Sequence, residues 1–129
     1  MKRLSLLGIG AVSLLLVALW VLPSWADVPT VSIQGPKEVK ANQPFSITLT
    51  IVHQGNNFIH HISRLAIYVD GKEVKAWQYS WRSHPKEESW SISHELTLEQ
   101  GATISAIATC NLHGPSKEAT LAVLPSSSP

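Results

Sequence analysis

The sequence predicts an all-β protein: an immunoglobulin-like antiparallel β-sandwich of about seven strands, preceded by a signal peptide. Three observations predict it. Apolar and polar residues alternate with period two after residue 26. Gly, Pro and Asn separate the alternating segments at regular spacing. The chain has 129 residues, which is the size of one small domain.

The alternation assigns the individual strands. Asp70-Gly71 is a two-residue sequence typical of a tight hairpin turn, and it joins two of them. The expected strands are residues 30–34, 45–51, 65–69, 72–80, 90–98, 104–108 and 119–124. They make up one domain over residues 27–124. The Ser/Pro-rich tail, residues 125–129, is expected to be disordered.

Residues 1–26 have the three parts of a secretory signal peptide. Lys2 and Arg3 are followed by an uncharged apolar run over residues 4–22, and Ser24-Trp25-Ala26 places small residues at a cleavage site. We therefore expect a periplasmic or otherwise extracytoplasmic protein. The alternative is an uncleaved anchor, because residues 4–22 are just long enough to span a bilayer. Membrane contact is expected only in that case.

Charge and cysteine content exclude two classes of protein. The formal net charge of +1 is too small for a nucleic-acid binder that works by neutralising phosphates. The single cysteine, Cys110, excludes an internal disulfide framework. In an exported protein, a lone cysteine is buried and inert, reactive with a partner, or a metal ligand.

Strand parity places Cys110 and His53 in equivalent positions, each one step beyond an inward-facing row of a strand. His53 continues the inward-facing row of residues 45–51, and Cys110 continues that of residues 104–108. Both residues should therefore lie where an inward row emerges at the end of a strand. Such a position can hold a partly exposed site on rigid supports.

Two short clusters offer metal ligands. His53, His60 and His61 share one loop, and Cys110 lies three residues before His113, which is followed by Gly114. Three imidazoles and one thiolate suit zinc, copper or iron, and the spacing leaves that choice open. Taken singly, each histidine is more often a surface or satisfied polar residue, and Cys110 a small buried apolar one.

The remaining histidines have ordinary explanations. His84 lies in a Ser-His-Pro loop sequence. His94 shares the parity of Trp90, Ile92 and Leu96, which is typical of a core histidine with its hydrogen bonds satisfied.

The clusters together resemble the superoxide reductase family, the iron domain of desulfoferrodoxin and neelaredoxin. The residues that carry the resemblance are His53, His60-His61-Ile62 and the Cys-Asn-Leu-His-Gly element that starts at Cys110. The resemblance implies a mononuclear iron held by His53, His60, Cys110 and His113, with His61 supporting the loop. It also implies reduction of superoxide to hydrogen peroxide, with electrons from a separate donor protein and Cys110 as the axial thiolate.

The sequence departs from the family pattern at one ligand. The family uses four imidazoles, and Asp27 stands where the fourth histidine would be, without the neighbouring lysine that attracts superoxide. If cleavage follows Ala26, the new α-amine or the carboxylate of Asp27 is a candidate replacement; His94 and His84 are others. The alternatives to an enzyme are a non-catalytic metal-binding or sensing module and a metal-free immunoglobulin-like periplasmic carrier.

Overall fold

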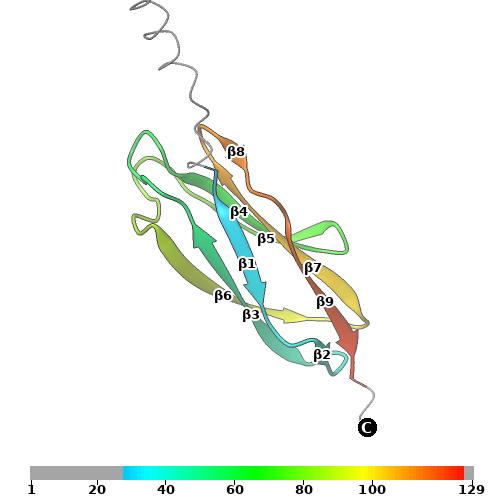
Figure 1. Ribbon diagram of the computed structural model, residues 1–129. Helices are drawn as coiled ribbons and strands as arrows, with labels where there is room; N and C mark the ends of the chain where they lie inside the picture. Colours follow the sequence, from blue (N-terminus) through cyan, green and yellow to red (C-terminus); the bar gives the residue numbers. More distant parts are fainter. Residues whose placement is uncertain (1–27, 127–129) are drawn as a thin grey trace, which may run out of the picture.

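The computed structural model describes residues 28–126 as a sandwich of two β-sheets (Figure 1). The smaller sheet has the order β1-β3-β6 and is antiparallel throughout. Its strands are β1 (Thr30–Gln34), β3 (Pro44–Val52) and β6 (Ser89–Thr97). The expected signal peptide, residues 1–26, lies outside the described residues, as does Asp27.

The larger sheet has the order β2-β9-β7-β4-β5, and β8 pairs with β7 beside this path. Its strands are β2 (Glu38–Val39), β4 (Ile62–Val69), β5 (Lys72–Gln78), β7 (Ala102–Cys110), β8 (Gly114–Pro115) and β9 (Ala119–Pro125). The sequence prediction of an all-β sandwich is thereby confirmed, and each of the seven expected strands is present.

The core lies between the sheets and is formed by the inward rows of both. Ile47, Leu49 and Ile51 of β3 meet Leu65, Ile67 and the inward residues of β7, all nearly inaccessible to solvent. Burying one such aliphatic side chain contributes roughly 1.5–3 kcal/mol. Most outward residues of β3 and β6 carry a hydroxyl group, and two pairs bond across the strands: Thr48 with Ser93 and Thr50 with Ser91. This inside–outside difference fixes the register, because a one-residue slip would expose the whole apolar row.

The turn between β4 and β5 has the conformation that its sequence predicts. Asp70 has φ +49° and Gly71 has φ +80°. Two consecutive positive φ values define the tight hairpin turn whose twist matches that of the flanking strands. The Asp70 carboxylate also accepts a hydrogen bond from the backbone N–H of Thr103 at 2.9 Å, which ties the hairpin to β7.

The structure differs from the sequence prediction at two short strands and at the C-terminal end. β2 and β8 have two residues each, too few to produce an alternating pattern. β2 pairs with β9 in parallel, so the sandwich is not purely antiparallel. Pro125 belongs to β9, and the N–H of Ser126 bonds to the carbonyl of Val39 at 2.7 Å, so order extends into the expected tail. Residues 127–129 lie outside the described part.

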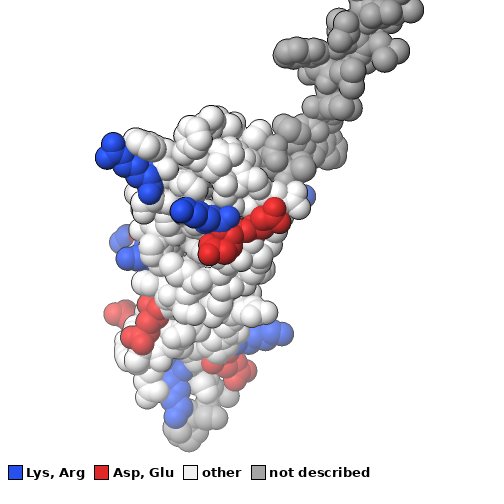
Figure 2. Space-filling model, turned by 90° about the vertical axis from the view of Figure 1, so that its left-hand side faces the viewer, with Lys and Arg blue, Asp and Glu red and all other residues white. Residues whose placement is uncertain are grey.

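The face of the molecule drawn in Figure 2 carries charges of both signs without a large cluster of either. Figure 2 shows basic and acidic side chains scattered over one face, some of them side by side. This distribution agrees with the nearly neutral composition. Within residues 28–126 there is no helix long and apolar enough to cross a membrane.

The core description predicts a large difference between two leucines. Leu49 is fully buried, whereas Leu124 is 59% exposed. Leu49→Ala should lower the free energy of unfolding by about 3 kcal/mol, because it leaves a cavity between the sheets. The matched variant Leu124→Ala should cost less than about 1 kcal/mol. Urea unfolding followed by tryptophan fluorescence measures both; equal losses would contradict the assignment of the core.

Candidate metal centre

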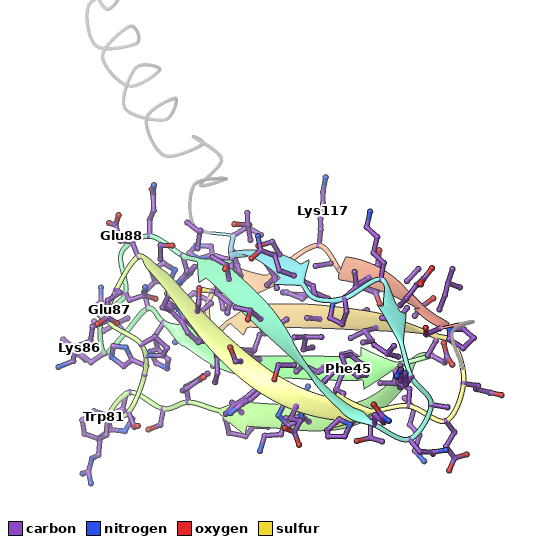
Figure 3. All side chains as sticks on the ribbon, turned by 90° about the horizontal axis from the view of Figure 1, so that it is seen from below. Phe45, Trp81, Lys86, Glu87, Glu88 and Lys117 are labelled. Atoms are coloured by element: carbon purple, nitrogen blue, oxygen red, sulfur yellow. The ribbon has the colours of Figure 1, made fainter. Side chains whose placement is uncertain are left out.

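The centre is built at one end of the sandwich, where one strand of each sheet ends. His53 directly follows β3 and is 1% exposed, and Cys110 is the last residue of β7 and is 2% exposed. Both therefore continue inward rows, as strand parity predicts. Figure 3 shows that Lys86, Glu87 and Glu88, from the connection between β5 and β6, lie at one end of the sandwich and Phe45 lies toward the other. The backbone contacts of Glu87 and Glu88 described below identify the first of these ends as that of the centre.

Four side chains meet at this end. One ligand atom each from His53, His60 and Cys110 lies within 4.8 Å of the others. His113 joins them through Nδ1, which is 3.1 Å from Nε2 of His60 and 3.6 Å from Sγ of Cys110. The ring of His60 lies between those of His53 and His113, with centroid separations of 4.6 and 4.9 Å. The structure thus brings together three imidazoles and one thiol.

The loop from His53 to His60 is folded by its own polar groups. Oδ1 of Asn57 accepts hydrogen bonds from the backbone N–H groups of Ile59 and His60, both at 2.8 Å. Gly55 has φ +74°, a conformation that side chains disfavour, and its carbonyl accepts a bond from Nδ1–H of His60 at 3.1 Å. Because Nδ1 carries the proton, the lone pair of His60 is on Nε2, the nitrogen that faces His113.

The second ligand loop is a tight turn between β7 and β8. Cys110 pairs with Gly114 across the turn, and Gly114 has φ +84°, a conformation that glycine adopts more readily than any other residue. This turn folds His113 back toward Cys110. A thiolate and an imidazole three residues apart can in this way bind the same ion.

Asn111 joins the two ligand loops. Its Nδ2–H donates to the carbonyl of Ile59 at 2.7 Å, and its Oδ1 accepts from the backbone N–H of His61 at 2.9 Å. Its own N–H donates to the carbonyl of His61 at 3.0 Å. The sequence pattern did not predict this role of Asn111, although Asn111 lies inside the Cys-Asn-Leu-His-Gly element.

The connection between β5 and β6 supports the centre from a third side. The carbonyl of Glu88 accepts from the N–H of His53 at 2.8 Å, and that of Glu87 accepts from Nδ2–H of Asn56 at 3.1 Å. The His84 ring stacks on that of His61 with a centroid separation of 4.9 Å. No sequence signal pointed to this segment as part of the site.

Two aromatic side chains pack near the centre. Trp90 is opposite Ile51 in the β3–β6 register, and Ile51 lies two residues before His53. The rings of Trp90 and Tyr79 meet edge-on, with their centroids 5.9 Å apart. Burial raises the pKa of the Tyr79 phenol above its ordinary value. Tyr79 therefore stays neutral at physiological pH and adds no charge near the histidines.

The other candidate residues lie outside the cluster. Nδ1–H of His61 donates to the carbonyl of Asn57 at 3.1 Å, which is the loop-supporting role expected for it. His94 is opposite Ile47, about 20 Å along the strand from His53, and its ring meets that of Trp77 edge-on at 5.7 Å. Asp27 lies outside the described residues.

The donor set fits a metal ion. In residues 28–126, His53, His60 and Cys110 are the group whose ligand atoms come close enough to share one, and His113 contacts two of the three. Imidazole and thiolate ligands suit iron, copper and zinc, so geometry alone leaves the metal open.

Comparison with known families indicates which metal relatives of this chain bind. The family model described as Desulfoferrodoxin matches residues 26–118, which is well over half of the chain. The chain belongs to the desulfoferrodoxin family. Membership of this family implies that the metal is iron, and the match contains all four clustered residues.

Solved structures of known proteins have the same fold. Superoxide reductase (neelaredoxin) from Ignicoccus hospitalis is 25% identical, with a TM-score of 0.59 over 77% of this chain and 80% of that one. The CARDB domain of a Pyrococcus furiosus protein, solved in complex with two metal ions, is 21% identical, with a TM-score of 0.55 over 75% and 91%. The search of curated proteins finds no match.

The geometry predicts that two half-buried histidines differ in their effect on metal binding. His60→Ala removes a member of the cluster and should weaken iron binding by about tenfold or more, since even indirect partners of a metal site cost that much. His94→Ala should leave iron affinity unchanged. Iron titration of both purified variants measures this, and equal affinities would contradict the placement of the site.

Proposed function

We propose that this chain is an exported mononuclear iron protein that reduces superoxide to hydrogen peroxide. The observation that carries the proposal is the meeting of one thiol and three imidazoles at the end of the sandwich, in a member of the desulfoferrodoxin family. The similarity to a superoxide reductase of the same fold supports it. The apolar leader over residues 4–22 supports export.

The exposure of the four side chains differs in a way that suits this reaction. His53 and Cys110 are buried, whereas His60 and His113 are half-buried. A small anion can therefore approach from the side of His60 and His113, while the buried thiolate stays protected from solvent. Bound iron supplies a one-electron couple. Superoxide, one electron and two protons from water together give one molecule of hydrogen peroxide.

The protein's own groups hold this chemistry in place. Cys110 would hold the iron through its thiolate, which would donate electron density to the metal and so favour release of peroxide with its O–O bond intact. The three imidazoles are neutral ligands, so one thiolate is the whole negative charge of the described donor set. We expect the electron to come from a separate donor protein, since the one cysteine of this chain, Cys110, is already assigned to the metal site.

A non-catalytic metal-binding or sensing role is the second candidate, and one observation favours it. Among residues 28–126 the cluster holds three imidazoles where the family uses four, since His61 and His84 stack on each other and His94 lies elsewhere. Such a module would bind iron and leave superoxide unconsumed. The two candidates therefore separate in one assay.

The catalytic proposal is tested by superoxide consumption in the presence of a reductant. The iron-loaded protein should consume superoxide and release hydrogen peroxide, and its oxidised form should have a thiolate-to-iron charge-transfer band. Cys110→Ser should remove the band and lower the rate about a hundredfold or more, because it removes the thiolate ligand. Iron binding without superoxide consumption would contradict the catalytic proposal and favour the non-catalytic metal-binding or sensing role.

The ligand that replaces the family's fourth imidazole is a further proposal within this function. Thr30 pairs with Val52, the residue before His53, so the described chain starts beside the metal centre. We propose that Asp27 completes the coordination of the cleaved protein. If its carboxylate binds, Asp27→Ala should shift the charge-transfer band; if its α-amine binds, one added N-terminal residue should do so. An unchanged band in both proteins would exclude Asp27.

A further inference from the structure

His53 is held by a side chain from its own loop. Its Nδ1 is 2.6 Å from Oδ1 of Asn56, a half-buried residue three positions later. The His53 ring itself is 1% exposed, so an acceptor for this nitrogen must come from the protein. Asn56 is therefore in a position to determine which ring nitrogen of His53 carries the proton.

The contacts of the Asn56 amide fix which of its ends faces His53. Nδ2 lies 2.7 Å from the carbonyl oxygen of His53 and 3.1 Å from that of Glu87. A carbonyl oxygen only accepts, so the donating NH₂ must point at these two atoms. Oδ1 is then the atom that faces the imidazole.

This orientation determines the tautomer of His53. An amide oxygen also only accepts, so the proton of the neutral ring must be on Nδ1. The lone pair is then on Nε2, which is the nitrogen free of the proton and able to bind a metal. The same arrangement occurs at His60, where the acceptor is the backbone carbonyl of Gly55.

We propose that Asn56 is a positioning residue of the metal centre: its Oδ1 holds His53 in the Nδ1–H tautomer, so that Nε2 is presented to iron. This inference rests on the proposed function, in which His53 is a ligand. It also assigns a second task to the same amide, because its NH₂ group ties the ligand loop to the connection between β5 and β6. Partners of this kind commonly change metal affinity 10–100-fold.

Two substitutions separate these tasks. Asn56→Leu removes both the acceptor and the donor, whereas Asn56→Asp keeps an acceptor oxygen and removes the donor. Gln54→Leu is the matched control, because Gln54 is an exposed amide side chain of the same loop. Circular dichroism and thermal unfolding establish that each full-length variant is folded.

The first measurement needs no metal. Nitrogen-15 NMR of the imidazole rings in the metal-free protein reports which ring nitrogen carries the proton. His53 should be the Nδ1–H tautomer in the unmodified chain, in Asn56→Asp and in Gln54→Leu, and a mixture of tautomers in Asn56→Leu. His60, whose acceptor is backbone, should keep its tautomer in all four proteins. A His53 ring protonated on Nε2, or unaffected by Asn56→Leu, would overturn the proposal.

The second measurement is iron affinity, read with the position of the charge-transfer band. Asn56→Leu should weaken iron binding about 10–100-fold, and Asn56→Asp should restore most of the loss. Equal losses in both variants would overturn the tautomer role and assign Asn56 to tethering alone. If the unmodified chain binds no iron, the proposed function fails, while the NMR result still decides whether Asn56 sets the ring.

Discussion

The pleat of two strands decides where this protein can bind a metal. Along β3 and β7 every second side chain points into the sandwich, and apolar residues fill those positions. His53 and Cys110 come next in the two inward rows, at the ends of these strands, and both are buried. A slip of either strand by one residue would turn its ligand outward and expose its apolar row as well. Core packing and metal-site geometry therefore depend on the same register.

Strand register alone brings two of the four ligands into place. His60 and His113 are on loops, and these loops keep their shape through amide side chains and backbone groups rather than through apolar contact. Asn57 folds the first loop, and Asn111 joins it to the second. Each such hydrogen bond contributes about 1 kcal/mol. Their main effect is to fix the backbone of the first loop and its position beside the second, from which His60 and His113 reach the centre.

The sequence predicted the parts of the molecule that follow a period or a local rule. Alternation gave the seven longer strands and the burial of His53 and Cys110, and Asp70-Gly71 gave the hairpin turn. The sequence did not predict β2 and β8, because a strand of two residues is too short to show an alternation of apolar and polar residues. It also missed the contacts of Glu87 and Glu88 with the first loop. Those contacts use backbone carbonyls, which every residue has, so no pattern of side chains in the sequence can predict them.

The central claim is that one thiolate and several imidazoles of this chain bind one iron ion. X-ray absorption at the iron edge of the loaded, full-length protein tests it most directly, because sulfur and nitrogen neighbours scatter differently. The account predicts one sulfur ligand, from Cys110, together with at least three nitrogen ligands. An iron shell of nitrogen and oxygen alone, without sulfur, would contradict it.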